Sequence, residues 1–213
     1  MSESAIPAAA VRAPIAGEDQ ARANFYALLG RLYAAAPDAA LLRAIAQADE
    51  LRVETRSGVA QDLAEAWRTL KTASGAMDPE AAAQEYVDLF VGVGESEVSL
   101  HGAEYLRSAG GSVLAELRSE LSRLGLSRQA GTSMFEDHLA SVLETMRVLI
   151  AGTQGVEPRP VGEQSAFFAR FVADWVPRCC AAIISAPIAN YYRRVAEFTG
   201  FFVAIERDSF AIE

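Results

Sequence analysis

The chain has 213 residues, a formal net charge of −9 and 51% hydrophobic residues. This hydrophobic share excludes a wholly disordered protein, and the length allows one domain with a substantial core. The acidic balance argues against nucleic acid as a partner, because such binding depends on Lys and Arg that displace phosphate counterions. A basic peptide is compatible with it, since opposite charge speeds the encounter.

The sequence predicts an N-terminal tail followed by one domain. Residues 1–17 are interpreted as a disordered N-terminal tail, and residues 18–213 as a single domain. The tail's apolar run, Ala8 to Val11, is too short for an export signal, and no segment has the length of a membrane span. The only cysteines, Cys179 and Cys180, are neighbours without another partner. We therefore expect no disulfide, interpret both as buried apolar residues, and expect a cytoplasmic protein with no direct membrane insertion.

The first half of the chain predicts helices. No run alternates strictly between apolar and polar residues, which favours an all-α fold over a sheet. Apolar residues at helical spacing predict helices at 18–35, around 41–45 and at 59–74. Asp78 followed by Pro79 then has the pattern of an N-cap and a first helical residue, and so predicts the start of the next helix.

The middle of the chain predicts two further helices. Ser112 is expected to cap a helix that stops at Gly125, a residue suited to a left-handed end. Ser133 and Glu136 have the spacing of a capping box, which predicts that the following helix starts at that point. Residues 152–162 hold two prolines and are predicted to be a linker.

The last third of the chain is rich in aromatic residues. We expect one helix to run from Phe167 through Trp175, a short helix through the cysteines, and a final helix opened by Pro187. Roughly eight helices with short connections make one compact all-α domain, because no linker is long or polar enough to separate two.

Two stretches of the sequence stand out as candidates for function. The first is an aromatic helix end followed by a glycine loop, at Glu85, Tyr86, Leu89, Phe90, Gly92 and Gly94. The second holds one of the chain's two histidines, at Glu136, Asp137 and His138. We expect the two stretches to meet in space, because an aromatic helix end followed by a flexible loop can build the wall and rim of a groove.

Known catalytic and cofactor motifs are missing from the sequence. There is no GxxxxGK, GxGxxG, GxSxG or HExxH pattern, and the chain has 2 histidines. One alternative is a small hydrolase that uses Asp137 and His138, although neighbours on a helix point about 100° apart. Another is a helical scaffold whose aromatic stripes are all interior. No metal site and no cofactor are predicted.

The two stretches together resemble a known family. Two motifs carry the likeness: Glu85-Tyr86-x-x-Leu89-Phe90 with Gly92 and Gly94, and Glu136-Asp137-His138-Leu139 with Glu144 and Met146 further along the helix. Together they are similar to the TorD/DmsD/NarJ group of cytoplasmic chaperones for molybdenum-containing oxidoreductases. The resemblance spans roughly residues 24–202. It implies the all-α fold of these chaperones and no catalytic turnover.

The resemblance also implies a partner. Such a chaperone binds the twin-arginine leader and the apo form of a molybdoenzyme catalytic subunit, assists cofactor insertion and prevents premature export. The resemblance assigns Tyr86, Leu89 and Phe90 to the wall of the groove, and Asp137 and His138 to its polar end. Homodimers, including domain-swapped ones, occur in the family. The resemblance also makes residues 92–105 the rim of this groove. This chain departs from the family pattern at Val93, where the relatives have proline, which predicts a less rigid rim.

Overall fold

A computed structural model describes residues 17–51, 58–92, 94–106, 112–127 and 134–212 of the chain. All the regular elements in these ranges are helical, which confirms the predicted all-α class. They are α1 (Gly17–Ala34), α2 (Ala39–Gln47), α3 (Val59–Ala76), α4 (Pro79–Tyr86), the π-helical turn η1 (Val87–Val91), α5 (Gly102–Tyr105), α6 (Val113–Arg123), α7 (Leu139–Ala151), α8 (Val161–Phe171), α9 (Val176–Ser185) and α10 (Tyr191–Ile212).

Several helix ends follow from local sequence, as predicted. The side chain of Asp78 accepts a hydrogen bond from the backbone N–H of Ala81, and Pro79 opens α4. At the other end of a helix, Gly125 and Gly152 have φ angles of 70° and 68° and terminate α6 and α7. Residues 152–160 then connect α7 to α8, where the linker was expected.

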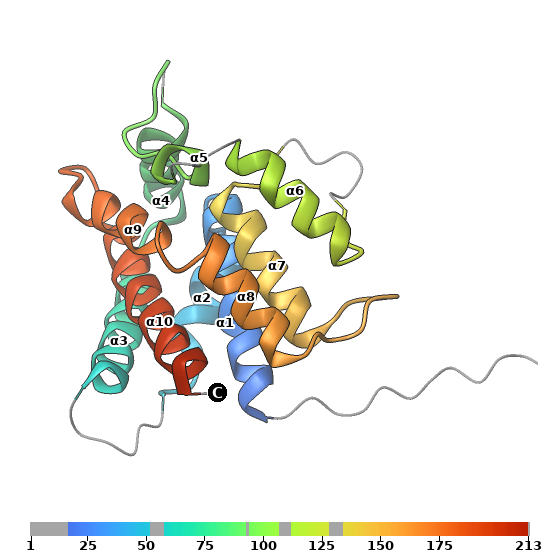
Figure 1. Cartoon of the computed structure of the whole chain (residues 1–213). Coiled ribbons are helices and arrows are strands. Elements are labelled where there is room, and N and C mark those ends of the chain that lie inside the picture. The colour runs from blue at the N-terminus through green and yellow to red at the C-terminus, as the bar shows by residue number, and fades with distance from the viewer. Residues whose placement is uncertain (1–16, 52–57, 93, 107–111, 128–133, 213) are drawn as a thin grey trace, which may run out of the picture.

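The helices pack into two groups around one core. α1 lies along α7, while α10 packs against α3 and α9. Figure 1 shows α6, α7 and α8 on one side of the molecule and α3, α9 and α10 on the other, with α1 and α2 between them. A single hydrophobic cluster draws buried residues from both groups. Tyr26 and Tyr33 of α1 are fully buried in it, and their hydroxyl groups bond to Glu206 and Thr199 of α10.

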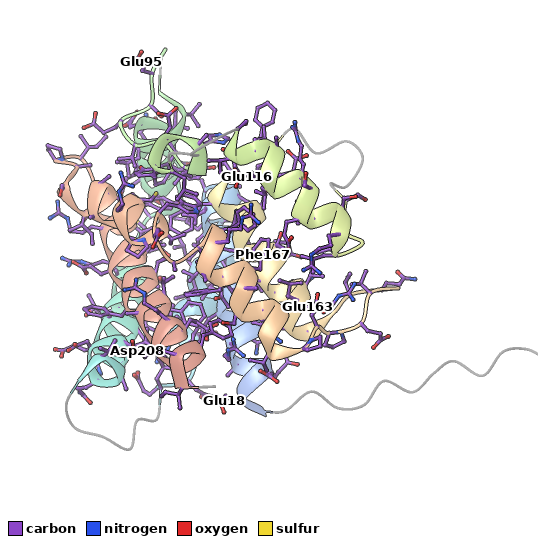
Figure 2. All side chains as sticks on the ribbon, in the orientation of Figure 1. Glu18, Glu95, Glu116, Glu163, Phe167 and Asp208 are labelled. Atoms are coloured by element: carbon purple, nitrogen blue, oxygen red, sulfur yellow. The ribbon has the colours of Figure 1, made fainter. Side chains whose placement is uncertain are left out.

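Most carboxylates lie at the periphery and apolar side chains fill the interior. Figure 2 shows this contrast between the labelled Glu18, Glu95 and Asp208 and the labelled Phe167 between the helices. Glu206 is an exception because it is 1% exposed. Its two oxygens accept hydrogen bonds of 2.8 and 2.9 Å from the guanidinium of Arg22. This buried ion pair fastens the last helix to the first.

Two helix starts differ from the prediction. α7 begins at Leu139, so the capping box expected from Ser133 and Glu136 is wrong: Glu136 lies in the preceding turn, and Ser133 lies outside the described residues. α10 begins at Tyr191, and Pro187 lies in the turn before it rather than in the helix. At α7 the side chain of His138 caps the helix in place of Ser133.

Two further details were missed. Trp175 does not continue the helix of Phe167; it lies in the turn between α8 and α9, and its indole N–H donates to the carbonyl of Phe171 at 2.6 Å. The helix that carries Tyr86 also widens into the π turn η1 before it ends at Gly92. The predicted tail falls outside the described residues apart from Gly17, which starts α1.

The two cysteines lie in the core. Cys179 and Cys180 are free and buried in α9, as interpreted from the sequence. Burial raises the pKa of the Cys179 thiol to about 12, which keeps it protonated at neutral pH. No helix in the described ranges is long and apolar enough to cross a bilayer.

Candidate functional site

Backbone hydrogen bonds join the chain just after the first stretch to the second stretch. The chain that follows the first stretch runs beside the start of α7. There the N–H of Gly102 donates to the carbonyl of Asp137 at 2.9 Å, and the N–H of Leu139 donates to the carbonyl of Leu100 at 2.8 Å. Residues 100–102, which follow the first stretch, therefore contact the second stretch, while a groove walled by the first stretch itself stays a prediction.

Asp137 is the polar centre of this junction. Its side chain is buried, with 4% of the residue exposed, and accepts hydrogen bonds of 3.2 Å from Nδ1–H of His101 and from the N–H of Ala103. Burial acts to raise the pKa of Asp137, but these bonds outweigh it and the pKa is lowered. The same bond raises the pKa of His101. Asp137 therefore holds residues 101–103 onto the head of α7.

His138 has a different task from its neighbour. Its Nδ1 accepts a hydrogen bond of 3.2 Å from the N–H of Ala140, so the ring caps α7. Burial lowers the pKa of His138 to about 4, and the neutral ring is the form that can accept this bond. A dyad of Asp137 and His138, as in the hydrolase alternative, does not form, because Asp137 bonds to His101 and His138 bonds to the backbone.

Glu85 of the first stretch caps another helix. Its two oxygens accept hydrogen bonds of 2.8, 3.0 and 2.8 Å from the backbone N–H groups of Asn190, Tyr191 and Tyr192. These donors form the N-terminus of α10, where an anion is favoured by the helix dipole. The carboxylate expected to meet a partner's arginines is thus committed to the chain's own last helix.

The aromatic residues of the first stretch lie between α4 and α10. Leu89 is fully buried in the core, so it does not form the surface of a groove wall. Tyr86 and Phe90 are half-buried, and their rings lie 5.4 Å apart in an edge-to-face contact. Both also contact the ring of Tyr192, at 5.8 and 4.9 Å. Their contacts therefore help to fix α10, and both side chains stay partly exposed.

The glycines of the first stretch are turn residues. Gly92 has a φ of 65°, and a Cβ at this position would clash with the backbone oxygen of Glu95. Gly94 has a φ of 106° and open space around it. Both conformations disfavour residues with a side chain, but only Gly92 is also required by close packing. Val93 lies outside the described residues.

A cavity of about 650 Å³ opens between α1, α6 and α7. α1 and α7 approach closely here, since a Cβ on Gly30 would lie 3.6 Å from the carbonyl oxygen of Ala140. Of the residues predicted for the site, Glu136 alone lines the cavity. The other lining residues are mostly small or apolar: Ala27, Gly30, Arg31, Ala34, Leu121, Gly125, Leu126, Ser127, Met134, Ala140, Ser141, Glu144, Thr145, Val148, Thr153 and Val156. Small residues at helical spacing in α1 were a sequence signal for it.

Two carboxylates line the cavity and each meets an arginine of this chain. Glu136 lies 3.1 Å from Arg118, and Glu144 lies 2.7 Å from Arg147 on the next turn of α7. Both arginines are at least partly exposed, and Glu144 is 53% exposed. The pair of Glu144 and Arg147 is of the kind that contributes about 0–1 kcal/mol, so an incoming cation can replace Arg147 at small cost. The side chain of Glu136 is only 13% exposed, so its pair with Arg118 is more shielded from water.

Comparison with known proteins supplies an independent finding. A family model described as the nitrate reductase delta subunit matches residues 56–181, which is more than half of the 213 residues. The matched range contains both stretches and the whole of α6 and α7. A search of curated proteins found no match.

Proposed function

The chain belongs to the nitrate reductase delta subunit family of redox-enzyme maturation chaperones, and from this premise we propose that it binds the twin-arginine leader of a molybdoenzyme subunit in the cavity between α1, α6 and α7. The chaperone holds the apo form of its client in the cytoplasm while the molybdenum cofactor is inserted, and releases it for export afterwards.

The observation that carries this proposal is the pairing of an apolar cavity with two carboxylates. A twin-arginine leader offers two guanidinium groups followed by an apolar stretch that readily forms a helix. Apolar grooves receive such stretches, and the volume of about 650 Å³ falls in the range of ligand-binding pockets. Glu136 and Glu144 supply acceptors for two guanidinium groups.

Arginine suits these acceptors better than lysine. A guanidinium group can present two N–H donors to one carboxylate, and such charge-assisted bonds are roughly twice as strong as neutral ones. In this chain Arg147 already binds Glu144 in that manner, through Nε and Nη2 at 2.7 Å each. One of the client's arginines would take the place of Arg147 on Glu144, and the other would take the place of Arg118 on Glu136.

A titration with a synthetic leader tests the proposal. The probe is a fluorescent peptide with two consecutive arginines followed by an apolar stretch. We expect saturable binding by the wild-type protein, and a loss of about 5- to 30-fold in affinity for Glu136→Gln and for Glu144→Gln, because each removes a charged acceptor. A peptide with two lysines in place of the arginines should bind more weakly.

Glu197→Gln is the matched control. Glu197 forms an i,i+3 pair with Arg194 on α10, which resembles the pair of Glu144 and Arg147 but lies away from the cavity. Its substitution should leave peptide affinity unchanged. The proposal fails if the wild-type protein does not bind the arginine peptide, or if the control weakens binding as much as the cavity variants do. The first result would favour the helical scaffold alternative.

A further inference from the structure

Phe135 is an exposed aromatic side chain on a fixed backbone. Its exposed fraction is 50%, and it is the one aromatic residue among the exposed large hydrophobic residues of the described ranges. Its carbonyl oxygen accepts hydrogen bonds from the N–H of His138 at 3.2 Å and from the hydroxyl of Ser141 at 2.9 Å. The backbone that carries the ring is therefore fixed by hydrogen bonds, while the ring itself is half exposed.

His101 extends this aromatic surface. Its ring centroid lies 6.1 Å from that of Phe135, in an edge-to-face arrangement, and its side chain is 39% exposed. The bond from Nδ1 to Asp137 fixes the orientation of the imidazole. We call the pair of Phe135 and His101 the aromatic platform.

The aromatic platform adjoins the cavity. Met134 and Glu136, the two neighbours of Phe135 in the chain, both line the cavity, as does Ser141, whose hydroxyl binds the Phe135 carbonyl. A peptide that places a guanidinium group on Glu136 therefore has its adjoining residues within reach of Phe135. An uncovered aromatic ring next to an acceptor for arginine offers a place for an apolar side chain of the same peptide.

We propose that the aromatic platform is a second subsite for the client leader, which receives a large apolar or aromatic side chain next to the arginine that binds Glu136. This inference rests on the proposed function and adds a selectivity to it. The cavity and its carboxylates select the arginines, and the platform selects a neighbouring residue by its size.

A double-mutant cycle between protein and peptide tests this subsite. The probes are two leader peptides that differ only beside the arginine pair, one with phenylalanine and one with alanine. Phe135→Ala should reduce the affinity for the phenylalanine peptide about tenfold and leave the affinity for the alanine peptide unchanged. Phe135→Tyr should retain the preference for phenylalanine.

Ile188→Ala is the matched control, since Ile188 is 49% exposed and lies between α9 and α10. It should not distinguish the two peptides. The platform is refuted if Phe135→Ala weakens both peptides equally or neither. The platform is also refuted if Phe135→Ala changes only the oligomeric state measured by sedimentation, because Phe135 would then be a contact between copies of the chain. If the wild-type protein binds neither peptide, both the proposed function and the platform fail. If it binds the phenylalanine and alanine peptides equally well, the platform alone is refuted.

Discussion

Removal of the Glu85 carboxylate should destabilise the protein through α10. In Glu85→Ala, three backbone N–H groups lose acceptors at 2.8, 3.0 and 2.8 Å. A hydrogen bond to a charged group contributes about 1.5–3 kcal/mol, but three bonds to one carboxylate are not additive and water can reach part of the helix end. We therefore expect a loss of about 2–4 kcal/mol in the free energy of unfolding. For a chain of this size that corresponds to a decrease of about 4–15 °C in Tm.

Urea denaturation and calorimetry of three variants provide the assay. Glu85→Gln keeps one acceptor oxygen and should lose about half as much as Glu85→Ala. Asp88→Ala is the control, because the carboxylate of Asp88 is exposed and accepts one side-chain bond from Gln84, and it should cost less than about 0.5 kcal/mol. Folded Glu85→Gln should bind the arginine peptide as the wild type does. A loss for Glu85→Ala no larger than for Asp88→Ala would refute the capping role, and weakened peptide binding by folded Glu85→Gln would restore Glu85 to the peptide site.

Three other predictions concern single residues. Gly92→Ala should destabilise the protein by about 2 kcal/mol more than Gly94→Ala in urea denaturation, because both positions have positive φ but only the Cβ at Gly92 collides with a backbone oxygen; equal losses would contradict this. His138→Ala should cost about 1 kcal/mol at pH 7.5, and His138→Asn should recover it as an alternative cap. The folded pKa of His138 is about 4, below its ordinary value of 6.5, so its contribution to the free energy of unfolding is present above pH 6.5 and is lost as pH falls through 4. The free energy of unfolding of His138→Ala should therefore depend less on pH over this range. An acid transition identical to that of the wild type would contradict this prediction. Arg22→Ala should cost about 3–5 kcal/mol, because it leaves the buried carboxylate of Glu206 without its cation; a calorimetric loss below 1 kcal/mol would show that water replaces the guanidinium.

Helix starts were predictable where the signal is local. Asp78 and Pro79 adjoin the helix that they open, so their pattern placed α4 correctly. The start of α10 was not predictable in this way, because its cap is Glu85, more than 100 residues earlier in the chain. At α7 the cap is His138, a residue type that seldom has this role, and the helix starts at Leu139 rather than directly after Ser133.

The site was predictable in its parts but not in its position. Residue types and order indicated that the two stretches belong together, and residues 100–102 do join them. The cavity depends on a property that periodicity alone does not reveal, which is the close approach of α1 and α7 at Gly30 and Ala140. Its second carboxylate, Glu144, is on the exposed side of a helix whose apolar stripe dominated the sequence pattern.

The dependence of the fold on α10 has a consequence for synthesis. This helix contributes Glu206 to Arg22 near the start of the chain, supplies the backbone donors for Glu85, and packs against α3 and α9. Until its 22 residues have emerged from the ribosome, the earlier helices lack the element against which their aromatic faces close. Until α10 has been synthesised, the nascent chaperone is therefore itself an incomplete polypeptide with exposed apolar surface.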